Sequence, residues 1–171
     1  MKTSEIDALL DLTDDFELCN GVFGRFADFN NEIDVDSYSE EERVVTLVWH
    51  ASGIIGNGGF EYLLEGDFNG DSGFIYTAAA FKTIGAAESY AAFQRALGAF
   101  GGHYPTDPKQ RIAAFHCLPE HERTAINRQF WDDDDNMRSG LARYIRERRQ
   151  RCHQLLSAAS AKPKLLERLF R

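Results

Sequence analysis

Apolar residues recur along much of this chain at intervals of three and four, which is the period of an amphipathic α-helix. The clearest examples are the runs over residues 44–55 and 60–64. Convincing alternation of apolar and polar residues, which would indicate β-strands, is absent. The pattern therefore predicts an all-α fold, a bundle of about seven to nine helices that forms a single domain over residues 1–171.

Several residues mark where helices should begin. Asp107 followed by Pro108 predicts a helix start, because aspartate caps free backbone N–H groups and proline fits the first turn. Two serine–acid pairs have the spacing of a capping box and predict helix starts near Glu5 and Glu40: Ser4 with Asp7, and Ser39 with Glu42.

Apolar spacing and glycines predict the remaining helices. The alanine-rich stretch over residues 74–100 should form a helical hairpin that breaks at Gly85. A further helix is expected from Pro119 to about residue 131, and the longest helix over residues 136–157. Four apolar residues at helical spacing predict an early helix: Val22, Phe23, Phe26 and Phe29. A loop is expected after it, over residues 30–36.

The sequence Asn57-Gly58-Gly59-Phe60 joins two of the apolar runs. Adjacent glycines between helices indicate a corner with a positive φ or a close backbone approach, which residues with a Cβ do not adopt cheaply. We expect Gly58 or Gly59 to have the positive φ, and Asn57 to cap the helix that starts at Phe60. The motif lacks a nucleophile and a general base, so by itself it indicates a structural feature and not a reaction.

The composition is typical of a protein that folds on its own. A chain of 171 residues, 43% of them hydrophobic, is long enough for one core and too short to expect two domains. No apolar run approaches the roughly 20 residues that span a bilayer, and acidic residues interrupt the N-terminus where a signal peptide would be apolar. An odd number of widely spaced cysteines indicates free thiols in a reducing compartment: Cys19, Cys117 and Cys152. We therefore expect a cytoplasmic protein.

Charge is distributed unevenly along the chain. Residues 1–75 hold 17 acidic and 3 basic residues, a formal charge of −14, whereas residues 76–171 hold 10 acidic and 16 basic residues, a charge of +6. A concentrated negative surface repels nucleic acid and raises the association rate of basic protein partners. The alternative is a solvated acidic face that only aids solubility. The arginine-rich stretch over residues 143–151 could contact nucleic acid, but pairing with the acidic half or solvation of a long helix fits the net charge better.

Two acidic segments resemble calcium-binding loops without completing one. Residues 67–73 place oxygen ligands at alternate positions, but Ser72 stands where the loop needs glycine and Ala78 where it needs glutamate. The acidic residues 132–135 fail at the same two positions of the loop. We therefore expect a turn in which Asp71 or Ser72 caps the next helix, and an acid-rich helix N-terminus at 132–135.

No other group of residues has the spacing of a metal or catalytic site. His50, beside Trp49 in an apolar run, is expected to be a hydrogen-bonded core or boundary residue and not a general base. Five histidines and cysteines are too widely spaced for a structural zinc site: His116, Cys117, His121, Cys152 and His153. We expect no metal, no cofactor and no catalytic residues.

Four short segments together resemble, in their order and spacing, a bacterial family of DNA-mimic protein domains. They are Asn57-Gly58-Gly59-Phe60, Ile84-Gly85-Ala86, Phe130-Trp131 and Tyr144-Ile145. The similar portion runs from about Val44 to Arg148, with acidic helices over residues 1–43 before it and a tail over residues 160–171 after it. The resemblance implies an all-helical domain without known catalytic residues. For the member that named the family, it implies an acidic surface that imitates duplex DNA and occupies the DNA-binding face of a transcriptional regulator.

We interpret the chain as an acidic protein-binding module whose partner is a basic protein, with DNA mimicry as its most specific form. The motif residues 57–60 and Gly85 are expected to be structural. The alternative is a small enzyme or metal-dependent protein that uses the region of Asn57 and Asp67. The interpretation includes no direct binding of nucleic acid or membrane, and it leaves the oligomeric state open, a dimer included. Nine acidic residues are expected to form the partner surface: Asp11, Asp14, Asp15, Glu17, Asp34, Asp36, Glu40, Glu41 and Glu42.

Overall fold

Helices form throughout the part of the chain that the structure describes. The computed structural model describes residues 3–27 and 34–161, and these contain nine α-helices, two short 3-10 helices and no β-strand. The prediction of an all-α bundle of seven to nine helices is confirmed. In chain order the elements are α1 (Thr3–Leu10), α2 (Asp15–Phe26), η1 (Val35–Ser37), α3 (Glu40–Leu64), η2 (Ser72–Phe74), α4 (Ile75–Thr83), α5 (Ala87–Gly98), α6 (Pro108–His116), α7 (Glu120–Trp131), α8 (Asp134–Glu147) and α9 (Arg149–Ala161).

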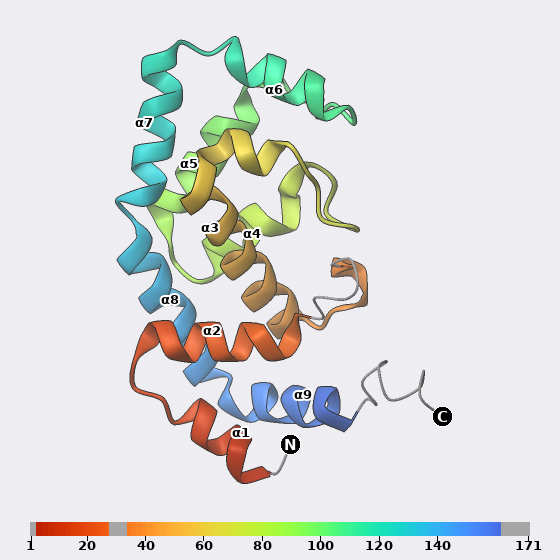
Figure 1. Cartoon of the computed structure of the whole chain (residues 1–171), viewed down its shortest axis with the longest axis vertical. Helices are drawn as coiled ribbons and strands as arrows, with labels where there is room; N and C mark the ends of the chain where they lie inside the picture. The colour runs from red at the N-terminus through yellow and green to blue at the C-terminus, as the bar shows by residue number, and fades with distance from the viewer. Residues whose placement is uncertain (1–2, 28–33, 162–171) are drawn as a thin grey trace.

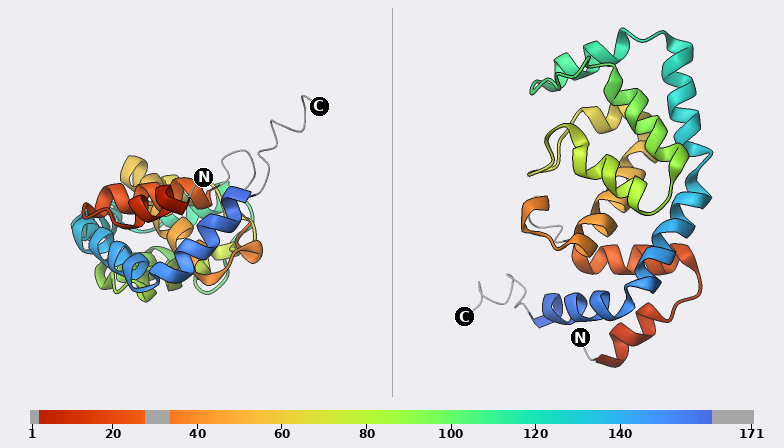
Figure 2. Two further views of the ribbon diagram at one scale, coloured as in Figure 1. Left: turned by 90° about the horizontal axis from the view of Figure 1, so that it is seen from below. Right: turned by 180° about the vertical axis from the view of Figure 1, so that it is seen from behind.

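α3 is the longest helix, with 25 residues, and it crosses the middle of the molecule (Figure 1). α4 packs along it, α2 and α9 contact its N-terminal half, and α7 contacts its C-terminal half. α7 and α8 follow one another down one side, while α1, α2 and α9 form one end of the molecule (Figure 2). The acidic N-terminal helices therefore lie beside the arginine-rich C-terminal helices.

The core is one continuous apolar cluster organised around aromatic rings. Phe60, Phe81, Phe93 and Phe130 come from α3, α4, α5 and α7, and all four are buried. Five pairs of these rings have centroids 5.0 to 6.0 Å apart, in tilted or edge-to-face arrangements. Each such pair contributes about 0.5–1.5 kcal/mol beyond the burial of its area. The aromatic cluster thus holds four helices together.

The predicted corner at the double glycine is a kink inside α3. Gly59 has φ 70° and ψ −169°, which interrupts the helix, so the prediction of a positive φ at Gly58 or Gly59 is confirmed. The backbone N–H of Phe60 donates to Oδ1 of Asn127 on α7 at 3.0 Å. A Cβ on Gly59 would lie 2.7 Å from the amide of Asn127, so only glycine leaves room for this contact.

The predicted cap at this corner was assigned to the wrong residue. Asn57 does not cap the second half of α3, because its side chain donates to the carbonyl of Gly53 one turn earlier at 2.8 Å. Asn127, which is distant in sequence, accepts from the freed N–H group instead. Gly85 has φ 79° and separates α4 from α5, as predicted.

Two helix boundaries differ from the sequence-based expectation, and two are confirmed. α1 begins at Thr3, so Ser4 lies inside the helix and is not its N-cap. The expected helix over residues 136–157 is two helices, because Arg148 leaves helical geometry (φ −105°, ψ 22°) and α9 turns to pack on α1 and α2. The Ser39–Glu42 capping box and the Asp107 cap both form. Phe29 and residues 30–33 of the predicted loop lie outside the described residues.

Candidate functional site

The nine acidic residues predicted to bind a partner lie in two groups near opposite ends of α2 (Figure 1). α2 has 12 residues and is therefore about 18 Å long. Between its ends, its exposed residues include Asn20, Gly24 and Arg25, which are not acidic. The first acidic group lies between the end of α1 and the start of α2: Asp11, Asp14, Asp15 and Glu17. The second acidic group lies at η1 and at the start of α3: Asp34, Asp36, Glu40, Glu41 and Glu42.

Some of these carboxylates also cap helices. Asp14 accepts from the backbone N–H of Glu17 at 2.8 Å and caps α2. Asp34 accepts from the N–H of Asp36 at 3.2 Å and caps η1. Glu42 accepts from the N–H of Ser39 at 3.0 Å in the capping box. Substituting these residues would change helix stability as well as surface charge.

Arginines of α8 and α9 pair with part of the acidic surface, as the sequence analysis favoured. The paired groups remain partly exposed, so each pair contributes at most about 1 kcal/mol. The pairs reduce the charge that three of the nine predicted acids present to a partner. They are Arg146 with Asp15 at 2.7 Å, Arg149 with Asp11 at 3.0 Å, and Arg151 with Glu41 at 3.6 Å.

A third set of acids, which was not assigned to the partner surface, lies next to the first acidic group. Asp135 at the start of α8 lines a surface hollow of about 370 Å³ together with Asp14 and Asp15. Arg138, in the same hollow, pairs with Asp134 and, at 3.4 Å, with Asp135. These residues lie near opposite ends of the sequence, and only the packing of α2 on α8 brings them together.

Asp133 has a different role from its acidic neighbours. Its side chain is buried and accepts from the backbone N–H of Ser89 at 2.9 Å and from the Ser89 hydroxyl at 2.7 Å. Asp133 therefore caps α5, a separate helix, from the start of α8. The expectation of an acid-rich helix N-terminus holds for Asp134 and Asp135, which lie in the first turn of α8.

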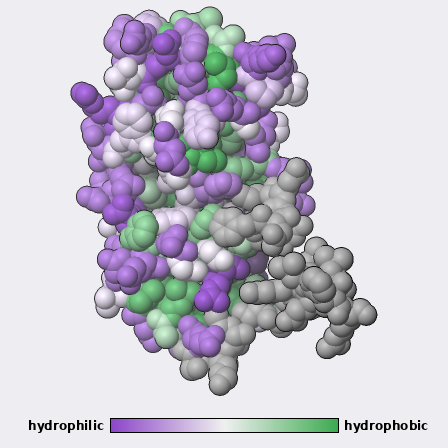
Figure 3. Space-filling view, viewed as in Figure 1, coloured by the Kyte–Doolittle hydropathy of each residue, from purple (hydrophilic) through white to green (hydrophobic). Residues whose placement is uncertain are grey.

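Hydrophilic side chains predominate on the face seen in Figure 3, with small apolar areas between them. Phe16 and Trp131 are among the large apolar residues that are exposed, at 51% and 47%. The ring of Phe16 packs on Trp49 at 5.4 Å, and Trp131 donates to the carbonyl of Ile55 at 3.1 Å. None of the described helices combines the length and the apolar character needed to cross a membrane.

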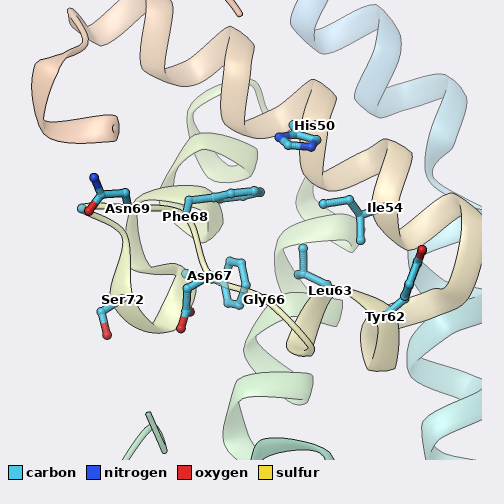
Figure 4. A pocket seen from close by; sticks show the side chains of 11 residues that line it. His50, Ile54, Tyr62, Leu63, Gly66, Asp67, Phe68, Asn69 and Ser72 are labelled. Atoms are coloured by element: carbon cyan, nitrogen blue, oxygen red, sulfur yellow. The ribbon is translucent and has the colours of Figure 1, made fainter. Parts of the chain in front are cut away.

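A cleft of about 740 Å³ opens between α3 and the loop that leads to α4 (Figure 4). Its apolar walls include Ile54, Leu63, Phe68 and Phe74, and His50 also lines it. Polar side chains at the cleft come from the loop: Asp67, Asn69 and Ser72. Of the two residues that the alternative function would use, Asp67 lines this cleft and Asn57 does not.

Asp67 is held at the cleft by a buried arginine. Arg111 on α6 is 2% exposed and forms an ion pair with Asp67, whose side chain is 34% exposed. The Tyr104 hydroxyl accepts from Arg111 at 3.0 Å and donates to Asp67 at 3.3 Å. Burial raises the pKa of Tyr104, so the hydroxyl keeps the proton that it donates.

The loop also uses a second carboxylate for a structural purpose. Asp71 is buried and accepts from the backbone N–H groups of Tyr76 and Thr77 at 2.7 and 2.9 Å, which confirms the predicted cap. Its oxygens therefore point to the start of α4. Among residues 3–27 and 34–161, no three His, Cys, Asp or Glu side chains are grouped as metal ligands.

The residues considered for zinc or thiol chemistry are not brought together. His116 on α6 pairs with Glu61 at 2.9 Å, while Cys152 is buried on α9. All three cysteines are free. Burial raises the pKa of Cys19 to about 12 and that of Cys152 to about 11, so both remain unreactive thiols near neutral pH.

His50 is a boundary residue, as predicted, but the predicted hydrogen bond is not made by its Nδ1 atom. Its ring stacks on Phe68 with a centroid distance of 5.2 Å and contacts Phe23 at 6.1 Å. Its Nδ1 atom is buried without a hydrogen-bond partner among the described residues. Burial lowers the pKa of His50, which favours the neutral imidazole at neutral pH.

We expect His50 to make the folded state less stable as the pH falls below about 6.5. The pKa of His50 is lowered on folding, so below its unfolded value of about 6.5 the unfolded chain binds more protons than the folded chain. His50→Phe keeps a ring against Phe68 and removes the titrating group. Urea unfolding at pH 7.5 and pH 5.5 should show a smaller loss of stability for His50→Phe than for the parent.

The exposed His121 provides the matched control. His121→Gln should lose stability between the two pH values as the parent does, because its side chain is in solvent in both states. An equal loss of stability for the parent and His50→Phe would contradict the assignment of this pH dependence to His50.

Comparison with curated proteins and with solved structures found no match to this chain. A protein-family model described as DMP19-like protein matches residues 36–148. The match contains the kink at Gly59, the break at Gly85, the cleft and most of the second acidic group, whereas the first acidic group precedes it. With about two thirds of its length matched, the chain belongs to the DMP19-like protein family, the family of DNA mimics that its sequence resembles.

Proposed function

We propose that this protein is an acidic module that binds a basic protein in place of duplex DNA. The DNA-binding face of a transcriptional regulator is the kind of surface that fits such a module. Membership of a DNA-mimic family is the observation that carries the proposal. The formal charge of −14 over residues 1–75 supports it, because a concentrated negative field speeds association with basic proteins.

The acids without an arginine partner among the described residues are the strongest candidates for direct contact. Asp14 and Glu17 are exposed in the first acidic group, and Asp36 and Glu40 are exposed in the second. Asp135 also lies in the hollow with Asp14, but it pairs with Arg138 at 3.4 Å and is therefore a weaker candidate. The resemblance supplies no catalytic residues, so the proposal assigns the protein a binding role and no reaction.

The spacing of the acids also supports this role. Asp14 and Glu17 are three residues apart at the start of α2, an axial rise of about 4.5 Å, against an axial rise of about 3.4 Å per phosphate of one DNA strand. The two acidic groups are separated by about the length of α2, roughly 18 Å. This distance is of the same order as the width of the DNA major groove, about 12 Å. A basic helix that enters the major groove could therefore contact both groups.

The direct test is competition between this protein and duplex DNA for one partner. The partner is isolated from the native cell extract on the immobilised protein, eluted with salt and purified. We expect added duplex DNA to displace it, and its affinity for the protein to fall about tenfold or more between about 50 and 200 mM salt. If the partner binds this protein and DNA at the same time without interference, mimicry is excluded.

Charge reversal in the second acidic group should identify the contact surface. The double variant Asp36→Lys, Glu40→Lys should slow association about tenfold and change dissociation less, because rim charges act mainly by steering. Glu65→Lys is the matched control for the single variant Glu40→Lys, because both change the charge by the same amount and Glu65 is exposed at the other end of α3. An equal effect of the control would assign the change to net charge and not to the second acidic group.

A further inference from the structure

We propose that the cleft beside His50 and Asp67 binds a small, uncharged aromatic molecule that carries N–H donor groups. The cleft volume of about 740 Å³ lies within the range of ligand pockets, about 300–1,000 Å³. Figure 4 shows Phe68, Ile54 and Leu63 around it, with Asp67 on the loop side. This inference is independent of the acidic partner surface.

The buried ion pair at the cleft costs free energy to form, and positioning a functional group is a reason for the protein to keep it. Arg111 is 2% exposed, and its Nε atom has no hydrogen-bond partner among the described residues. Burying such a charge removes its hydration, and one carboxylate returns only part of that free energy. The arrangement fixes the Asp67 carboxylate at the cleft with its charge already balanced.

Backbone strain occurs at the same place. Phe74 has φ 56° and is the one residue other than glycine with a positive φ in residues 3–27 and 34–161. This conformation costs about 1–3 kcal/mol and is typical of ligand-binding and active sites. The ring of Phe74 is thereby packed edge-on against Phe68 at 5.6 Å, which completes the aromatic wall of the cleft.

The lining residues determine the class of ligand. The four apolar side chains named above favour an aromatic ring. Asp67 only accepts hydrogen bonds, and with Arg111 and Tyr104 bound it keeps about two acceptor positions. The cleft is not lined by Lys or Arg among the described residues, so an anionic ligand would meet Asp67 without a compensating charge. A cationic ligand would meet an Asp67 that Arg111 already neutralises.

Three molecules with the same ring and different charge test the proposal: benzamide, benzamidine and benzoate. Backbone amide shifts of the full chain are followed by NMR as each molecule is added. We expect benzamide to shift the signals of residues 66–74, with a Kd of about 1 mM or below, and benzoate to leave them unchanged. Binding of benzoate as tight as that of benzamide, tenfold tighter binding of benzamidine, or no binding of benzamide would overturn the proposal.

A variant that fills the cleft locates the binding site. Ile54→Trp places a large ring at the wall and should weaken benzamide binding at least tenfold. Ile112→Trp on α6 is the matched control, because Ile112 is also partly buried and lies outside the cleft. Equal weakening in both variants, or benzamide shifts confined to other helices in the parent, would also overturn the proposal. The parental shift map decides the outcome even if Ile54→Trp fails to fold.

Discussion

Gly59→Val should lower the free energy of unfolding by about 3–5 kcal/mol, measured by urea unfolding. A β-branched residue at φ 70° costs about 1–3 kcal/mol. The new Cβ would also lie 2.7 Å from the amide of Asn127 and displace it. The N–H of Phe60 then loses its acceptor, and loss of a cap costs about 0.5–2 kcal/mol.

Gly53→Val on the same helix is the control for this variant. Gly53 is exposed, and a Cβ at this position meets nothing within 4 Å. The substitution should leave stability nearly unchanged or raise it slightly, because valine favours a helix more than glycine does. Gly58→Val should also destabilise the protein, since its Cβ would lie 2.6 Å from the Cβ of Tyr62, an atom that rotation of the side chain does not move. A Gly59→Val protein that unfolds at the parental urea concentration would refute the close contact between Gly59 and Asn127.

Asp67→Ala should destabilise the protein by about 3 kcal/mol, because it leaves the charge of Arg111 buried without a partner. This expected loss of stability lies at the lower end of the range for broken buried ion pairs, since the Asp67 side chain is 34% exposed. Arg111→Met should cost less, because the remaining carboxylate can be hydrated. Urea unfolding of each single variant measures the difference.

The double variant Asp67→Ala, Arg111→Met provides the control. An apolar side chain in place of the arginine removes the unpaired charge, so the double variant should be more stable than Asp67→Ala alone. If Asp67→Ala and Arg111→Met are equally destabilising, the different burial of the two side chains does not determine the loss of stability when this ion pair is broken.

The fold was predictable from sequence where its signals are local. The Ser39–Glu42 capping box, the Asp107 cap and the break at Gly85 each depend on residues within a few positions of one another. The break at Arg148 was missed because no glycine or proline marks it. It depends instead on the packing of α9 against α1 and α2, and such tertiary contacts override local propensity.

The candidate sites were predictable only in part, for the same reason. The sequence identified the acidic residues of both groups, but it could not place Asp135 beside Asp14, because α2 and α8 meet only in the folded chain. It singled out Asp67 as a poor calcium ligand, and nothing near Asp67 in sequence points to Arg111 on α6. Asn127 was likewise overlooked as the cap of a glycine corner on another helix.

The caps supplied by α7 and α8 have a consequence for the order of folding. Asn127 completes the second half of α3, and Asp133 completes the N-terminus of α5. The acceptors for these backbone N–H groups come from α7 and from the start of α8. The groups therefore lack these acceptors until the α7–α8 segment has docked. A nascent chain that has emerged only as far as α6 therefore exposes two incomplete helix starts beside the aromatic core. Folding of the central helices is thus coupled to synthesis of the C-terminal third, and we expect a chain that ends after α6 not to fold independently.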